Sequence, residues 1–207
     1  MKVGTDGTLL GAWAQGGSHI LDVGTGTGLI ALMMAQRFPA AQVVGIDIDA
    51  EAVAQAQENV AASIFASRVE ILLRDLAVTE GEFDAIVSNP PYFTNALKSP
   101  DAQRTMARHT DTLTYAQLMR HGRRLLSDNG VLSVVVPADC KSRMESEAAL
   151  TGLFKCRECA IKTTERKPAK RYLLAFAKHP HELSHTTLTL GTPDALALTQ
   201  DFYLRTP

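Results

Sequence analysis

The chain has 207 residues, of which 45% are hydrophobic and 21% charged, and its formal net charge at pH 7 is −1. This size fits a single domain spanning residues 1–207, and the near-neutral charge argues weakly against a polyanion partner. There is neither an apolar run long enough to cross a membrane nor the apolar core of a signal peptide at the amino terminus. Three cysteines fit reduced thiols, so we expect a cytoplasmic protein without a membrane partner.

Strand and helix patterns alternate along the chain. Strands are expected at His19–Val23, Gln42–Ile46, Val69–Leu73, Phe83–Ser88, Val131–Val136, Lys155–Lys162 and Arg171–Lys178. Helices are expected at Gly28–Phe38, Ala50–Ala62, Leu113–Leu126 and Met144–Leu153. This order predicts an α/β, doubly wound, mostly parallel seven-stranded sheet that ends in an antiparallel hairpin. Residues 179–207, with a short apolar alternation at Leu188 and Leu190, are expected to be packed structure.

A glycine loop follows the first expected strand. It reads Asp22-Val23-Gly24-Thr25-Gly26-Thr27-Gly28, whereas a nicotinamide fingerprint G-x-G-x-x-G would need glycine at Leu29. Gly24, Gly26 and Gly28 would let the backbone approach a ligand, and the acid before them suits a cofactor with a free ammonium group. A dehydrogenase remains the alternative for this loop taken alone.

Three further acids follow strands. Asp47 ends the second strand and is placed to accept the two hydroxyls of a ribose. Asp49 is the competing acid, and it is equally suited to cap the next helix. Asp75 follows the third strand.

Asn89-Pro90-Pro91-Tyr92 follows the fourth strand. An exocyclic amine on a planar base is a poor nucleophile unless acceptors hold both of its hydrogens. The Asn89 side-chain oxygen and the Pro90 carbonyl can supply those acceptors, and Tyr92 offers a stacking face for a flipped base, with Phe93 as the alternative. A plain turn is the other interpretation, because Asn and Pro favour turns.

Together these motifs resemble the amino-group methyltransferases that use S-adenosylmethionine, whose signature is (N/D/S)-P-P-(Y/F/W). The resemblance implies that Asp22 binds the methionine amino group directly or through water, and that Asp75 and Leu76 contact the adenine ring. Asn89 is expected to contact the cofactor as well as the base. It also implies the class I methyltransferase fold, which is Rossmann-like, and a methyl transfer that needs no metal.

The segment Lys2-Val3-Gly4-Thr5-Asp6-Gly7 and the stretch Ala107-Arg108-His109-Thr110 narrow this resemblance. They are similar to segments of bacterial tRNA1(Val) (adenine(37)-N6)-methyltransferases, and the similarity covers nearly the whole chain. It implies methylation of adenine N6 in tRNA and places Thr5, Asp6 and Gly7 over the methionine end of the cofactor. Thr5 or Asp6 could also cap a helix. Members usually carry some tens of further residues before this segment, so we expect that stretch to be missing here.

Basic residues are concentrated towards the carboxyl end of the chain. Residues 155–178 carry eight Lys or Arg against two Glu, whereas residues 1–60 carry six acids against two bases. A basic strip suits the phosphates of tRNA. The expected RNA-binding residues are Arg104, Arg108, His109, Arg166, Lys167, Lys170 and Arg171. Simple solvation is the alternative for any one of them.

Cys156 and Cys159 form a CxxC pair on an expected strand, where positions three apart face opposite ways, so no metal site is expected. A monomer is assumed.

Three rival functions stay open. The first is methylation of a glutamine amide in a release factor, which uses the same tetrapeptide but normally with an added helical domain. The second is a DNA or ribosomal RNA adenine-N6 methyltransferase. The third is a protein that binds the cofactor or RNA without turnover.

Overall fold

The computed structural model describes residues 4–91 and 113–202. The strands are β1 (His19–Val23), β2 (Gln42–Asp47), β3 (Val69–Leu73), β4 (Phe83–Ser88), β5 (Leu126–Pro137), β6 (Phe154–Lys162), β7 (Arg171–Ala177) and β8 (Ser184–Thr189). The helices are α1 (Thr5–Trp13), α2 (Leu29–Arg37), α3 (Ala50–Ala61), α5 (Tyr115–Leu125), α6 (Lys141–Leu150) and α7 (Pro193–Thr199), with 3-10 turns η1 (Leu76–Val78) and η2 (Ala138–Cys140).

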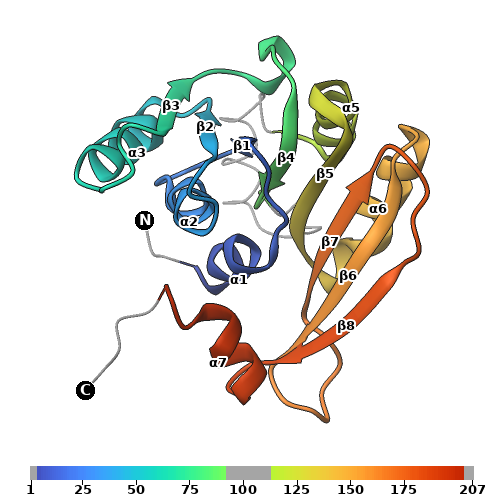
Figure 1. Ribbon diagram of the computed structural model, residues 1–207. Coiled ribbons are helices and arrows are strands. Elements are labelled where there is room, and N and C mark those ends of the chain that lie inside the picture. The colour runs from blue at the N-terminus through green and yellow to red at the C-terminus, as the bar shows by residue number, and fades with distance from the viewer. Residues whose placement is uncertain (1–3, 92–112, 203–207) are drawn as a thin grey trace, which may run out of the picture.

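All of these strands belong to one sheet with the order β3-β2-β1-β4-β5-β7-β6-β8 (Figure 1). The first five strands are parallel, and β7 is antiparallel to both β5 and β6. This arrangement confirms the expected fold class. The sheet differs in having an eighth strand, β8, which pairs parallel with β6 at the edge. Most of the side chains of β8 are exposed, so its sequence lacks the apolar pattern of a buried strand.

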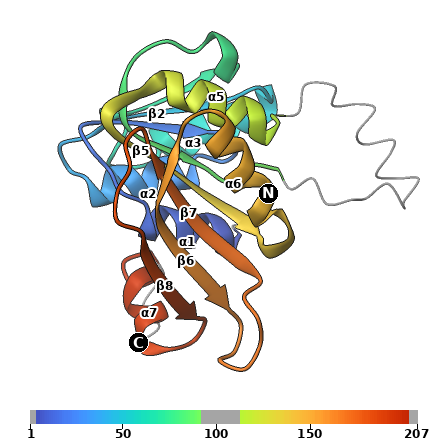
Figure 2. The same cartoon turned by 90° about the vertical axis from the view of Figure 1, so that its right-hand side faces the viewer.

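Helices cover both faces of the sheet, each over its own hydrophobic core. One core joins α1, α2, α3 and α7 to the sheet, and includes Leu10, Met34 and Ala56. The other joins α5, α6 and η1 to the opposite face, and includes Leu118, Met119 and Met144. Figure 2 shows α5 along the top of the molecule and α1 and α7 below it. The chain is therefore doubly wound, as the alternation of elements predicted.

The N-terminal caps of two helices can be compared with the predictions from the sequence. The Asp49 side chain accepts hydrogen bonds from the Glu51 and Ala52 amides, which confirms Asp49 as the cap of α3. The cap of α1 is Gly4, which makes no side-chain bond, so the expectation of a Thr5 or Asp6 cap was wrong. Thr5 and Asp6 instead lie in the first turn of the helix.

Two elements have a boundary that differs from expectation by three residues or more. The strand β5 begins at Leu126 rather than Val131, because Leu126 already pairs with Phe83 before an irregularity in the ladder. The helix α6 runs from Lys141 to Leu150 rather than from Met144 to Leu153. Gly152, with a φ of +73°, terminates it in a left-handed turn.

A β-bulge in β6 corrects the expectation for the CxxC pair. Lys155 pairs with Phe176 and Arg157 with Ala175, so Cys156 is an extra residue on its strand. Cys156 and Cys159 consequently lie on the same face, in the core shared with α1. Both thiols are buried and free, and burial raises the pKa of each. No cluster of metal-ligating side chains occurs among the residues that the structure describes.

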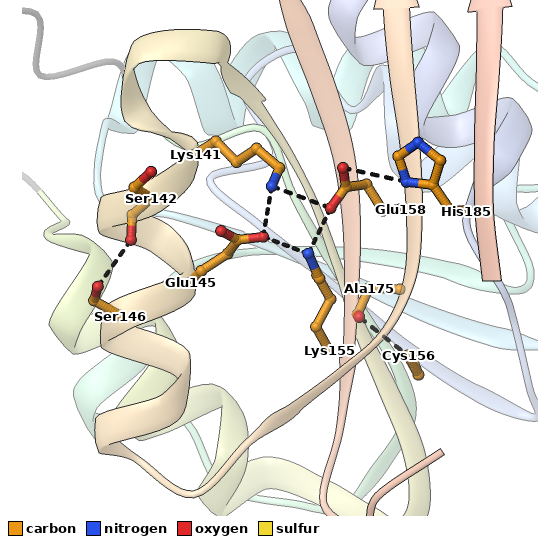
Figure 3. A network of polar contacts seen from close by, with 9 residues as sticks. All are labelled: Lys141, Ser142, Glu145, Ser146, Lys155, Cys156, Glu158, Ala175 and His185. Atoms are coloured by element: carbon orange, nitrogen blue, oxygen red, sulfur yellow. Dashed lines mark hydrogen bonds and ion pairs between the residues drawn. The ribbon is translucent and has the colours of Figure 1, made fainter. Parts of the chain in front are cut away.

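The same bulge places Lys155 and Glu158 together on the opposite face, in an ion-pair network with α6 (Figure 3). Glu158 has a side chain only 6% exposed, and it lies 2.5 Å from the Lys155 ammonium and 3.2 Å from that of Lys141. Glu145 contacts both lysines, at 2.5 Å from Lys155 and 2.9 Å from Lys141. His185 of β8 lies 3.4 Å from Glu158. The network therefore connects α6, β6 and β8.

None of the helices within the described ranges is both long and apolar enough to span a membrane.

Candidate active site

The carboxyl ends of β1, β2, β3 and β4 lie along one edge of the sheet. Because these strands are parallel neighbours, the segments that follow them begin side by side. Val23 pairs with Ser88, and Asp47 pairs with Leu73. The glycine loop, Asp47, Asp75 and Asn89 are thereby brought to the same edge, which is where open α/β sheets bind ligands.

The glycine loop turns sharply away from β1. Gly24, Gly26 and Gly28 have φ values of +69°, +55° and +79°, a region that other residues rarely adopt. The amides of Gly24 and Thr25 donate to the Ile46 carbonyl at 2.9 and 3.0 Å, which ties the loop to β2. A Cβ on Gly24 would meet nothing within 4 Å, so this part of the loop faces open space.

Asp22 is fully buried beneath the loop. Its Oδ2 accepts hydrogen bonds from the Thr25 hydroxyl at 2.7 Å and from the Ala31 amide at 3.0 Å. Burial raises the pKa of this carboxyl to about 7, although the two hydrogen bonds act to lower it. Asp22 therefore holds the loop against the start of α2. Its expected contact with the cofactor's amino group stays a prediction, and a direct contact would have to reach an oxygen that is buried here.

Asp47 is half-buried and also supports the loop. Its Oδ2 accepts from the Gly26 amide at 2.9 Å, and its Oδ1 accepts from the Asp49 amide at 3.1 Å. Each carboxylate oxygen has capacity for a further hydrogen bond. Since Asp49 is committed to capping α3, Asp47 is the better placed of the two to accept ribose hydroxyls.

Asp75 is exposed at the start of η1, where its side chain accepts from the Ala77 amide at 2.7 Å. The following residue, Leu76, is buried. From the facing helix, the Arg124 guanidinium donates to the Leu76 and Thr79 carbonyls at 3.3 and 2.9 Å. The segment expected to contact adenine is thus held in place from α5.

Asn89 and Pro90 begin the segment after β4. The buried Ser88 hydroxyl donates to the Val23 carbonyl at 2.8 Å, which fixes the end of β4 to the start of the glycine loop. Asn89 is half-buried and Pro90 is buried. The expected stacking residues Tyr92 and Phe93 lie outside the described residues, as do Arg104, Arg108 and His109.

The amino-terminal segment and the basic hairpin meet at an ion pair. The Arg171 Nε lies 2.8 Å from the Asp6 Oδ2, which joins the start of β7 to the first turn of α1. Gly7 packs beside Leu29 and Ile30, so this turn lies next to the helix that follows the glycine loop. Arg166, Lys167 and Lys170 belong to the turn between β6 and β7. A predicted cofactor residue and a predicted RNA residue are therefore direct partners, a pairing that nothing in the sequence indicated.

Sequence reasoning missed three residues that build this site. Gly45 of β2 leaves room for Thr25, because a Cβ there would lie 2.8 Å from the Thr25 hydroxyl. Thr25 and Ser88 both donate hydrogen bonds that fix loop positions. A polar Ser at the end of an apolar strand was a signal for Ser88. Gly45 and Thr25 offered none, because their contacts depend on the packing of β2 against the loop.

The carboxyl edge of the sheet suits S-adenosylmethionine because it combines hydrogen-bond acceptors with open space beside the glycine loop. Its ammonium and ribose hydroxyls are hydrogen-bond donors, and the carboxylates of Asp47 and Asp75 follow adjacent strands. The open space at Gly24 lies between Asp47 on one side and Asn89 on the other in strand order. This edge therefore offers hydrogen-bond acceptors to a ligand that carries donor groups.

Solved structures share this fold. A predicted O-methyltransferase from Agrobacterium tumefaciens superimposes with a TM-score of 0.76 at 17% identity, over 95% of this chain and 96% of that one. A TehB-like SAM-dependent methyltransferase from Corynebacterium glutamicum gives a TM-score of 0.56 at 20% identity, over 85% and 89% of the two chains. The fold and the site together define a class I methyltransferase whose methyl donor is S-adenosylmethionine.

The family model named methyltransferase small domain matches residues 8–167. Proteins named tRNA1(Val) (adenine(37)-N6)-methyltransferase are similar over almost the whole chain. The one from Phocaeicola vulgatus is 47% identical over 99% of this chain and 91% of its own length. Those from Bacteroides fragilis and Trichodesmium erythraeum are 41% and 42% identical, each over 99% of this chain and 92% of their own lengths. This chain belongs to that family of methyltransferases, which confirms the resemblance read from its motifs.

Proposed function

We propose that this enzyme transfers a methyl group from S-adenosylmethionine to the exocyclic N6 amine of an adenine in tRNA, adenine 37 of tRNA1(Val). The observation that carries the proposal is the pairing of Val23 with Ser88, which sets Asn89-Pro90 directly beside the glycine loop. The names of the relatives supply the nucleotide and the RNA. Because tRNA is the substrate, the proposed compartment is the cytoplasm.

The residues of this chain would act by holding and aiming the two reactants. S-adenosylmethionine supplies an electrophilic methyl group on a sulfonium. Asn89 through its side-chain oxygen and Pro90 through its carbonyl accept the two amine hydrogens, so the nitrogen lone pair points at the methyl group. The aromatic ring of Tyr92 stacks on the flipped adenine. Asp47 holds the ribose, Asp75 the adenine of the cofactor, and Thr5, Asp6 and Gly7 cover its methionine end.

The proton balance requires no base before attack. The neutral amine forms a bond to the methyl carbon as the carbon–sulfur bond breaks, so S-adenosylhomocysteine leaves as a neutral thioether. The methylated amine then carries the positive charge and loses a proton readily to solvent. Asn89 therefore needs only to accept hydrogen bonds, a role that an amide fills at every physiological pH. His109 is accordingly assigned to the RNA rather than to proton transfer. Arg104 and Arg108 contribute with it to phosphate binding, together with the hairpin residues Arg166, Lys167, Lys170 and Arg171.

The test is transfer of tritiated methyl from S-adenosylmethionine to tRNA from a strain lacking the modification, followed by nucleoside analysis. We expect label in N6-methyladenosine. Asn89→Ala removes one acceptor and should lower kcat by roughly 10²–10³ with little change in cofactor affinity, a loss typical of a positioned hydrogen-bonding group.

Two other results would contradict the proposal. Label in a protein rather than in tRNA would identify a glutamine-amide methyltransferase. An unchanged kcat in the Asn89→Ala variant would show that the tetrapeptide takes no part in the reaction. Calorimetric binding of S-adenosylhomocysteine by Asn89→Ala is the control, because retained binding shows that a loss of kcat does not come from misfolding.

A further inference from the structure

The helix α5 has a face that is basic and exposed. Between residues 113 and 127 the chain has four basic side chains, Arg120, His121, Arg123 and Arg124, and no Asp or Glu. The apolar side of the helix, with Leu118 and Met119 among its residues, is fully buried against the sheet. Arg120, Arg123 and Arg124 are exposed on the other side. Packing against the sheet therefore accounts for the apolar residues on one side of this helix, but it does not account for the basic residues on the other side.

The lysines of the ion-pair network have acidic partners, whereas the arginines of this face have none among the described residues. Lys141 and Lys155 pair with Glu145 and Glu158. Arg120 and Arg123, by contrast, have no ion pair within residues 4–91 and 113–202. Arg124 donates to backbone carbonyls rather than to an acid. The positive charge of this face is therefore not neutralised by neighbouring side chains.

The pKa of His121 is also affected by the positive charge of this face. Burial lowers its pKa, and Arg124 and Arg120 lower it further, whereas Asp75 acts in the opposite direction. Arg143 of α6 extends the basic face towards the start of α5, where its guanidinium lies 5.7 Å from the centre of the Tyr115 ring. Asp139 is the acid near that end. Asp75 and Asp139 are thus the acids that act on this face, against the four arginines Arg120, Arg123, Arg124 and Arg143.

The position of the helix connects this face to the candidate active site. In the chain, α5 is the crossover between β4 and β5, so its first turn starts from the edge that carries Asn89. A capping box fixes that start, since the Thr114 side chain accepts from the Gln117 amide and the Gln117 side chain accepts from the Thr114 amide. Arg143, whose guanidinium lies over the Tyr115 ring, is at this same end of the helix.

We propose that this basic face, formed by Arg120, Arg123 and Arg143, binds the phosphate backbone of the RNA substrate. The proposal rests on the proposed function and adds a contact surface to it, separate from the turn between β6 and β7. Arg120 and Arg123 are three residues apart and so project from the same side of the helix. Guanidinium groups bind phosphates through paired hydrogen bonds, which suits exposed arginines without acidic partners.

Three matched variants test the proposal. Arg120→Gln and Arg123→Gln each lower the net charge by one on α5, and Gln55→Glu lowers it by one on α3, which packs on the opposite face of the sheet. Gln55 is exposed, and its side chain makes 3.4 Å hydrogen bonds to Glu58 and Asn59 on its own helix. Binding is measured by fluorescence anisotropy with a labelled tRNA transcript in the presence of S-adenosylhomocysteine, over a range of salt concentrations.

Each arginine variant should weaken tRNA binding by about 3-fold to 10-fold. Because one phosphate contact is lost, the slope of log Kd against log salt concentration should also become shallower by somewhat less than one unit. The KM for tRNA should rise by the same factor, with kcat, affinity for S-adenosylhomocysteine and melting temperature unchanged. Gln55→Glu should leave all of these values at wild type.

The proposal is overturned if the arginine variants bind tRNA as wild type does, or if Gln55→Glu weakens binding equally. An acidic peptide that loses affinity for the arginine variants while tRNA does not would assign the face to a protein partner instead. Because binding is measured without turnover, tRNA that binds through α5 but accepts no methyl group would contradict the proposed function alone.

Discussion

At the scale of single residues, the candidate site separates side chains that shape the loop from side chains that face open space. Asp22 belongs to the first group, because both of its hydrogen bonds stay inside the glycine loop and the start of α2. Asp47 belongs to both, since it holds Gly26 and stands half-buried at the edge. The acid that precedes the glycines is thus a structural anchor at the least, and its burial has a measurable consequence.

Asp22→Asn should remove a pH dependence from stability. Because the folded state raises the pKa of Asp22 from 3.8 to about 7, the folded protein holds this proton more tightly than the unfolded chain. The resulting contribution to stability is fully present below 3.8 and is lost as the pH rises through about 7. Urea unfolding across this window should show that contribution declining in wild type and absent in the variant. Parallel curves for the two proteins would mean that Asp22 titrates normally.

At the scale of elements, the glycine loop combines a left-handed backbone with an open surface. The turn β8–α7 offers a comparison, because Gly191 also has a positive φ, +81°, and a Cβ there would likewise meet nothing within 4 Å. The two glycines therefore carry the same backbone requirement in different places. Only Gly24 lies at the candidate cofactor site.

Gly24→Ala and Gly191→Ala should each destabilise the protein by about 1–2 kcal/mol, the cost of a left-handed residue with a Cβ. Only Gly24→Ala should also weaken binding of S-adenosylhomocysteine, by 10-fold or more, because its methyl group projects into the space that the ligand needs. Melting temperature and calorimetry measure the two effects separately. Equal affinity in both variants would place the cofactor elsewhere.

At the scale of the whole molecule, the sheet is held together at its antiparallel end by charge as well as by apolar packing. The nearly buried Glu158 joins Lys141 of α6 and Lys155 of its own strand, and His185 of β8 contacts it from the edge (Figure 3). Burial raises the pKa of Glu158, but the hydrogen bonds from Lys155 and Lys141 outweigh this effect, so the pKa is lowered overall. The network stabilises the ionised form.

Glu158→Gln should destabilise the protein by roughly 1–3 kcal/mol, less than for a fully buried pair because both lysines are partly exposed. Since the folded-state pKa is lowered, the contribution of Glu158 is present above its ordinary value of 4.5 and is lost as the pH falls. The difference from wild type should therefore shrink in acid. Denaturant titrations at several pH values measure this difference. The control is Glu147→Gln, because Glu147 lies on α6 but has no ion pair among the described residues. An equal loss in both would show that the network adds nothing.

The motifs of this chain were readable because each depends on local sequence. Parallel strands end at one edge, so Asp47, Asp75 and Asn89 could be placed near the glycine loop from the order of elements alone. The cap at Asp49 was readable for the same reason. The β8 strand was not, because its side chains are mostly exposed and its pairing with β6 depends on a partner distant in the chain.

The sequence by itself determined the alternation of strands and helices, the residues at the carboxyl edge of the sheet and, through them, the family. Only the tertiary structure decided which side chains are partners. It buried Asp22, paired Asp6 with Arg171, and put Cys156 and Cys159 on one face through a bulge. The physical reason is that periodicity and turn chemistry act within a few residues, whereas burial, ladder register and ion pairing are set by segments far apart in the chain.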